Sequence, residues 1–312
     1  MRTPAPLLLP ALAACLLLTA CGSERAGTQN GGPGAAVPPG RTPVTDPGTD
    51  GVRITAVTLP TASPSPGGRG GGVHAEPLAT AWPDSGVSAA YEVTNHGTEA
   101  MTYTVLFTFA SDTGGAVDNK RETVRSVGAG RTVRGTVTLG ALPPGAPAVT
   151  RVKVAEVTKV PADEAPSEAG TCPPSGIRVF ADRGDAAMGL RVVGLHLENC
   201  GSRAYTVNGY PLLELLDDAR EPVGGVKILH GGGGIATGTG ADEPPRPVTL
   251  EPGEEATATL VWRNTTEFGD PVNVPHVRVR AKDGADPVTV TPHLDLGTTG
   301  KLGVGPWTQA ER

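Results

Sequence analysis

The sequence contains one ten-residue pattern twice: Tyr91–Ala100 reads YEVTNHGTEA, and Leu195–Ala204 reads LHLENCGSRA. In both copies alternating apolar residues predict a strand, an Asn-x-Gly turn follows, and a new strand begins after it. Each copy is later followed by a glycine turn before another strand, VGAGRTV at 127–133 and LEPGEEA at 250–256. Glycine accepts turn conformations that a Cβ atom resists. The repeat therefore predicts two tandem immunoglobulin-like β-sandwiches.

Apolar and polar residues alternate in much of the remaining sequence, which is typical of strands with one buried face. Glycine and proline interrupt these runs about every eight to twelve residues, as in all-β domains. The predicted strands are residues 87–93, 101–109, 131–139, 149–157, 177–180, 190–197, 205–207, 212–216, 256–262, 277–281 and 288–290. We expect the first sandwich at 52–160, a hinge rich in Pro, Glu and Ala at 161–170, and the second sandwich at 171–306.

The N-terminus has the features of a cleaved signal peptide. A short basic start precedes an apolar run, Leu7–Leu18, that is too short to span a bilayer as a helix. The boundary Leu18-Thr19-Ala20-Cys21 matches the lipobox of bacterial lipoproteins, in which the cysteine thiol accepts a diacylglyceryl group. We expect a signal peptide at 1–20 and a lipid on Cys21. The alternative is an ordinary secretory signal followed by a chance cysteine.

Residues 21–51 differ sharply from the signal peptide, because Gly, Pro, Thr, Ser and Asp dominate and large apolar side chains are almost absent. Such a segment buries too little surface to offset its ordering entropy, so we expect a disordered linker. Two acyl chains are enough for stable anchoring. The predicted location is the extracytoplasmic face of the cell membrane, with the lipid on Cys21 as the predicted membrane contact.

The composition bears on two questions, whether the protein binds nucleic acid and from which kind of organism it comes. The formal net charge is −6 and the basic residues are scattered, whereas a nucleic-acid-binding protein would present a basic face. We therefore expect no nucleic-acid partner. Arginine exceeds lysine, and Ala, Gly, Pro and Val are abundant, as in proteins from GC-rich genomes; an actinobacterial source fits this bias.

Four cysteines are present, and two of them remain free after processing. Cys15 leaves with the signal peptide and Cys21 carries the lipid, so Cys172 and Cys200 form the remaining pair. In an oxidising exterior such a pair most simply forms a disulfide. A zinc site is the alternative, but no histidine pair lies nearby to complete its ligands.

The second half, from Cys172 to Pro306, resembles the domain-of-unknown-function 4232 family of secreted and lipid-anchored actinobacterial proteins. The resemblance rests on Cys172, Asn199-Cys200-Gly201, Gly209-Tyr210-Pro211 with Leu212–Leu216 behind it, and Leu250-x-Pro252-Gly253 leading to Ala256, Leu260 and Trp262. It implies a β-sandwich, an extracytoplasmic location and a bridge between the two cysteines. It implies no established activity. The first half resembles only a generic immunoglobulin-like or adhesion-type module.

Two segments could be read either as ligand sites or as ordinary surface loops and turns. Gly231–Gly234, with further glycines to Gly240, could suggest a phosphate loop, but no Gly-Lys-Ser/Thr follows; we expect a mobile surface loop. Asp217, Asp218 and Glu221 could bind calcium, although a turn after a strand favours the same residues.

The candidate recognition surface is Gly209-Tyr210-Pro211, with an exposed ring; the alternative is a packed tyrosine at the start of a strand. The six histidines are dispersed, and no serine lies in a nucleophile elbow. We therefore expect no catalytic residue, no metal and no cofactor.

Two classes of function remain open. The favoured one is a non-enzymatic surface module that binds an envelope protein, a wall polymer or a small ligand, because tandem sandwiches on a tether suit presentation. The alternative is an envelope enzyme, or an accessory subunit of one, with a site between the two domains.

Overall fold

The described part of the chain consists of strands joined by turns and irregular loops. The structure, a computed structural model, describes residues 40–60 and 84–310, and these residues contain no helix. The predicted all-β, sandwich-type fold is therefore confirmed. Among these residues no helix is long and apolar enough to cross a membrane. Cys21 and the signal peptide lie outside the described residues.

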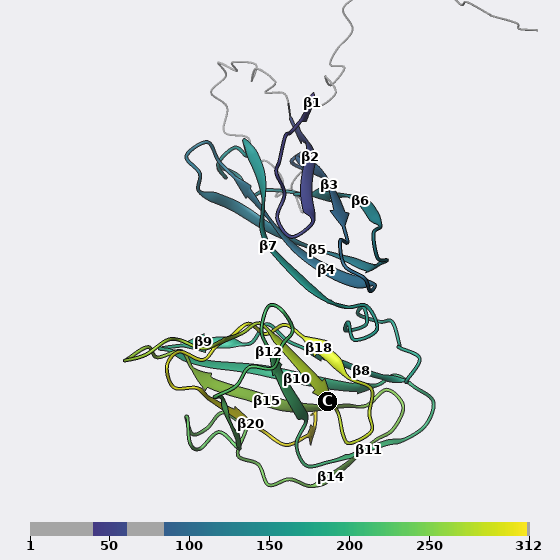
Figure 1. Cartoon of the computed structure of the whole chain (residues 1–312), viewed down its shortest axis with the longest axis vertical. Coiled ribbons are helices and arrows are strands. Elements are labelled where there is room, and N and C mark those ends of the chain that lie inside the picture. Colours follow the sequence, from purple (N-terminus) through teal and green to yellow (C-terminus); the bar gives the residue numbers. More distant parts are fainter. Residues whose placement is uncertain (1–39, 61–83, 311–312) are drawn as a thin grey trace, which may run out of the picture. The chain divides into compact units, whose positions relative to one another are not determined.

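The first sandwich pairs a four-stranded sheet, in the order β1-β2-β3-β6, with a three-stranded sheet in the order β5-β4-β7 (Figure 1). All its strand pairs are antiparallel. The strands are β1 (Gly40–Pro43), β2 (Val52–Leu59), β3 (Ser88–Thr94), β4 (Met101–Ala110), β5 (Ala116–Val127), β6 (Thr132–Thr138) and β7 (Arg151–Pro161). Alternate side chains of the two sheets meet in one hydrophobic core. At its centre the rings of Tyr91 and Phe107 lie 4.9 Å apart.

The second sandwich has a larger sheet in the order β13-β20-β15-β10-β8, to which β9 and β21 add at β10 and β15. Facing it is the sheet β12-β17-β18, and two short pairs, β11-β14 and β16-β19, complete the domain. The strands are β8 (Ile177–Ala181), β9 (Asp185–Ala187), β10 (Leu190–Asn199), β11 (Tyr205–Asn208), β12 (Leu212–Leu216), β13 (Lys227–His230), β14 (Pro247–Leu250), β15 (Glu255–Arg263), β16 (Asn273–Val274), β17 (His276–Arg280), β18 (Val288–Val290), β19 (Leu294–Asp295), β20 (Lys301–Val304) and β21 (Thr308–Gln309).

A separate hydrophobic core fills the second sandwich. Trp262 and Trp307 are its largest side chains, and both are almost fully buried. A buried indole N–H needs an acceptor. Trp262 donates to Asp295 Oδ1 at 2.7 Å, and Trp307 donates to the Ala281 carbonyl at 2.9 Å. The two indoles therefore fill the core and also form hydrogen bonds with residues at its border.

The repeated Asn-x-Gly motif closes the same corner in each sandwich. Asn95 is 1 % exposed; its Nδ2 donates to the carbonyls of Glu99 (2.7 Å) and Val127 (2.8 Å), and its Oδ1 accepts from Gly97 N. The backbone carbonyl of Asn95 accepts from the N–H of Gly130, in the glycine turn. One side chain thus joins the end of β3 to the strand that follows it and to β5.

Asn199, also 1 % exposed, makes the equivalent contacts in the second sandwich. Its Nδ2 donates to the carbonyls of Arg203 (2.9 Å) and Leu250 (2.8 Å), and its Oδ1 accepts from Gly201 N. Its carbonyl accepts from the N–H of Gly253. The alignment of the two ten-residue stretches therefore corresponds to one hydrogen-bond pattern formed twice.

Three predicted boundaries require correction. The linker expected at 21–51 is too long, because Gly40–Pro43 forms β1 and pairs with β2. The second sandwich extends past its expected end at 306, because β21 pairs with β15. The hinge expected at 161–170 begins with ordered contacts: Glu164 accepts from Arg278 Nε (2.9 Å) and Thr289 Oγ1 (2.6 Å). The first and third segments are polar, so their composition predicted flexibility, but backbone pairing or an ion pair orders them. The end of the second sandwich was placed too early, because Trp307 belongs to its core.

Candidate recognition surface

Gly209-Tyr210-Pro211 leads into β12, and the glycine has the positive φ (82°) that a Cβ atom would oppose. The Gly209 carbonyl accepts from Trp307 N at 2.9 Å, and Pro211 is buried. The Tyr210 ring stacks on His230, with ring centroids 4.0 Å apart and 9° between the planes. Tyr210 is half-buried and His230 exposed. The geometry favours the structural interpretation, a tyrosine packed at the start of a strand, while one part of the stack remains accessible.

The glycine-rich loop after β13 folds against the larger sheet. Gly231 and Gly232 are buried, and Gly231 N donates to the Val304 carbonyl. Asp242 Oδ1 accepts from the amides of both Gly232 and Gly233 at 2.8 Å. A phosphate would need those amides, and the protein's own carboxylate already occupies them. The phosphate-loop interpretation therefore fails, and the expected surface loop is in part a buried turn.

The acidic segment after β12 is a turn. Asp217 Oδ1 accepts from Glu221 N at 2.9 Å, and Asp217 N donates to the Glu221 carbonyl. Throughout residues 40–60 and 84–310, no three His, Cys, Asp or Glu side chains are placed to share a metal ion. This segment therefore follows the turn interpretation.

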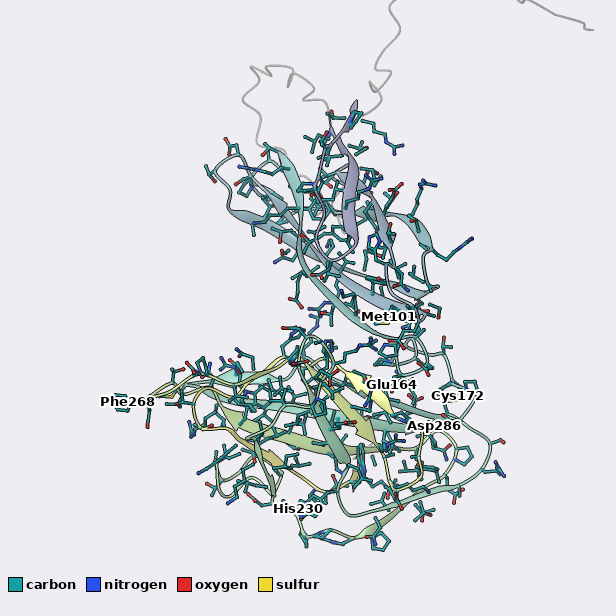
Figure 2. The ribbon with its side chains drawn as sticks, in the orientation of Figure 1. Met101, Glu164, Cys172, His230, Phe268 and Asp286 are labelled. Atoms are coloured by element: carbon teal, nitrogen blue, oxygen red, sulfur yellow. A yellow bond between two sulfur atoms is a disulfide. The ribbon has the colours of Figure 1, made fainter. Side chains whose placement is uncertain are left out.

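The structure joins the two predicted cysteines, Cys172 and Cys200, in a disulfide (Figure 2). Cys172 precedes β8, and Cys200 directly follows Asn199 at the end of β10. The bridge thus ties the start of the second sandwich to its Asn corner.

A cluster of six charged and aromatic side chains covers the outward face of β8, β10 and β15. We call it the polar face: Arg178, Phe180, Asp182, His196, Glu198 and Glu255. Its members share one side of the sheet because Phe180 lies opposite His196, and Arg178 opposite Glu198, in the antiparallel register. The alternate residues of the same strands, such as Val179, Leu195 and Leu197, enter the core.

Stacking and ion pairing fix the side chains of the polar face. The Phe180 ring stacks on His196 with centroids 4.8 Å apart, and the Arg178 guanidinium lies 4.3 Å from the centre of the Phe180 ring. Arg178 also pairs with Glu198. Each contact holds a side chain that remains partly exposed, so the face is ordered before any partner arrives.

His196 lies between two carboxylates. Its Nδ1 is 2.5 Å from Glu255 Oε1, and its Nε2 is 3.2 Å from Asp182 Oδ2. Gly194 makes this possible, because a Cβ atom there would clash with the Asp182 carboxylate. Both ring nitrogens are therefore engaged. The imidazole is thus held in place from both sides.

The first sandwich has the opposite charge pattern at the equivalent position. The repeat aligns Glu92 with His196, and Glu92 accepts from Arg53 Nη2 at 2.6 Å and Arg134 Nε at 2.8 Å. Hydrogen bonds from Arg53, then from Arg134, hold the pKa of Glu92 below its usual value. One position in the shared framework thus carries an acid between two arginines in the first sandwich and a histidine between two acids in the second.

His276, at the start of β17, is one of the six dispersed histidines, and the fold buries it. It is 4 % exposed, and its Nδ1 has no hydrogen-bond partner. Burial lowers the pKa of His276 from 6.5, since the charged imidazolium is poorly solvated there; Asp218 opposes this shift, while His293 and Arg220 add to it.

We expect acid to destabilise the protein through His276. The folded state resists protonation, so below about pH 6.5 the unfolded state binds more protons and the free energy of unfolding falls; above that pH this contribution is fully present. His276→Gln should reduce the loss of melting temperature between pH 7.5 and pH 5.5. The matched control is His96→Gln, at an exposed histidine. An unchanged acid sensitivity in the His276 variant would contradict the assignment.

The comparisons with known proteins bear on the second sandwich alone. The family model for a domain of unknown function, DUF4232, matches residues 172–308. This range runs from the first cysteine of the disulfide into β21, and it contains the Asn199 corner, the Tyr210 segment and the polar face. No curated protein matches the chain. The C-terminal half of the chain, residues 172–308, belongs to the DUF4232 family.

Proposed function

We propose that this protein is a lipid-anchored, extracytoplasmic binding module of the cell envelope, without catalytic activity. The observation that carries the proposal is the polar face. Six partly exposed side chains are held in place by each other, and the only histidine among them has both nitrogens engaged by carboxylates. Such a surface offers stacking and charged hydrogen bonds to a partner.

The proposed anchor rests on the sequence. The apolar run Leu7–Leu18 and the lipobox ending at Cys21 support export, cleavage and lipid attachment. Eighteen residues, 22–39, separate Cys21 from the first residue of β1. A chain held in this way meets its partner at a high effective concentration, so a weak contact is sufficient.

The anchor is tested by the Cys21→Ser variant. The wild-type protein should be recovered from the membrane fraction, with an intact mass equal to the chain from Cys21 plus a diacylglyceryl group. The variant should leave the membrane fraction. A wild-type mass that retains residues 1–20, or that lacks the lipid, would refute lipid anchoring.

Binding is tested with the full-length tagged protein in its native envelope. The double variant Phe180→Ser/His196→Ser should retain about tenfold less of any specifically bound component than the wild type does, because the stack at the centre of the face is lost. Thr94→Ala is the matched control: Thr94 aligns with Glu198 in the repeat and is outward-facing in the first sandwich. Equal retention by wild type and double variant would exclude the polar face as the binding surface.

A further inference from the structure

Two apolar side chains stand out by their exposure. Met188 is 100 % exposed and Phe268 is 97 % exposed, whereas the other exposed large apolar residues of the described chain lie between 38 % and 45 %. Single exposed apolar residues are ordinary on protein surfaces. Large apolar side chains that are almost completely exposed are less common, and Met188 and Phe268 are both of this kind.

The two residues belong to neighbouring loops of the second sandwich. Met188 is in the turn between β9 and β10, and Phe268 is in the loop after β15. Asn264, near the start of that loop, donates its N–H to the carbonyl of Gly189 at 3.0 Å. Figure 2 shows Phe268 at the outer end of its loop. We call Met188 and Phe268 together the apolar tip.

The backbone conformation at Met188 indicates that methionine does not stabilise the turn in which it lies. Residues 188 and 189 form a two-residue hairpin loop, with φ angles of 48° and 80°. Such type I′ turns favour asparagine or glycine at both positions, because a Cβ atom is crowded where φ is positive. Methionine here is unfavourable for the turn and buries nothing in return. A residue that is unfavourable for its turn and gains no buried contact in return indicates a functional position.

The charges around the apolar tip indicate the chemistry of its partner. Within the two segments that carry it, residues 183–188 and 264–270, the exposed charged side chains are three carboxylates, Asp185, Glu267 and Asp270, and one guanidinium, Arg183. This acidic excess is repelled by an anionic lipid surface, so membrane insertion is disfavoured. It is attracted by an apolar pocket with a basic border, in which the two side chains lose contact with water and the carboxylates pair with Lys or Arg.

We propose that the apolar tip inserts into an apolar pocket, bordered by Lys or Arg, on a second protein of the envelope. This inference rests on the proposed function, since it names the partner of the binding module. It adds a contact at the loop end of the same domain that carries the polar face.

The test is photocrosslinking of the full chain in the producing cells. Phe268→p-benzoylphenylalanine keeps an aromatic ring at the tip, and Val133→p-benzoylphenylalanine is the control at an exposed position of the first sandwich. We expect one discrete protein adduct from position 268 that is absent from position 133. Its yield should fall about tenfold when Glu267→Lys and Asp270→Lys are added. An adduct with a second copy of the chain, an adduct with lipid, no adduct, or an adduct insensitive to the charge reversal would each overturn the proposal.

Met188→Asn separates this role from stability. Asparagine suits the turn, so the melting temperature should stay the same or rise, while the yield of the adduct from position 268 should fall about tenfold. A full yield with Met188→Asn would overturn the role of Met188. If the native protein captures nothing in the envelope, the proposed function fails as well; if capture depends on the polar face but not on the tip, the tip proposal alone fails.

Discussion

Replacing Asn199 by alanine is expected to lower the free energy of unfolding of the second sandwich by about 3–5 kcal/mol. The substitution removes three hydrogen bonds from a side chain that is 1 % exposed, and it leaves the buried Leu250 carbonyl without its partner. A buried polar group without a partner retains its full desolvation penalty. The measurement is denaturant unfolding combined with hydrogen exchange resolved by peptide.

Asn95→Ala is the matched variant in the first sandwich, because Asn95 makes the same contacts there. Asn199→Ala should accelerate exchange in β10 and β15, and Asn95→Ala should accelerate it in β3 and β6. Asn199→Asp provides a second comparison, since it keeps the acceptor for Gly201 N but loses both amide donations. A loss below about 1 kcal/mol for Asn199→Ala would show that the corner is held by its turns alone.

Removal of the disulfide should have the next largest effect. The bridge joins residues 28 apart, and closing a loop of that length contributes about 3–4 kcal/mol in the chain-entropy description. The double variant Cys172→Ser/Cys200→Ser should therefore melt about 10 °C lower than the wild type in the second sandwich.

Reduction of the wild-type protein provides the control, because it opens the same bridge without changing the sequence elsewhere. Its melting temperature should approach that of the double variant, and the double variant should not respond to reductant. Hydrogen exchange in β3 and β4 should be unchanged in both cases. Equal melting temperatures for oxidised wild type and double variant would contradict a stabilising role for the bridge.

The sequence predicted most clearly the elements whose side chains alternate between core and solvent. The predicted strand at 101–109 appears as β4, Met101–Ala110, and that at 256–262 as β15, Glu255–Arg263. β5, at Ala116–Val127, was not predicted. Only two of its twelve residues are buried, and it is an edge strand, so its position depends on backbone pairing with β4 rather than on an apolar pattern.

The polar face could not be predicted as a site, because its residues are far apart in the sequence. Asp182 and His196 are separated by 14 residues, and His196 and Glu255 by 59. Only the register of β8, β10 and β15 brings them together. The pattern Arg178-x-Phe180-x-Asp182 does place three side chains on one side of a strand end, and this was the available signal. The Tyr210 segment was visible as a motif, but its stack on His230 was not.

Each asparagine corner is closed by residues of its own sandwich. The contacts that maintain the fold are therefore different from the side chains that form the outer surface. The inward side chains of the repeated strand preserve the architecture, while the outward position between them forms different ion pairs in the two sandwiches. Glu92 between two arginines and His196 between two acids are two solutions at that one position. The same framework therefore carries outward groups of opposite charge without any change in the corner that closes it.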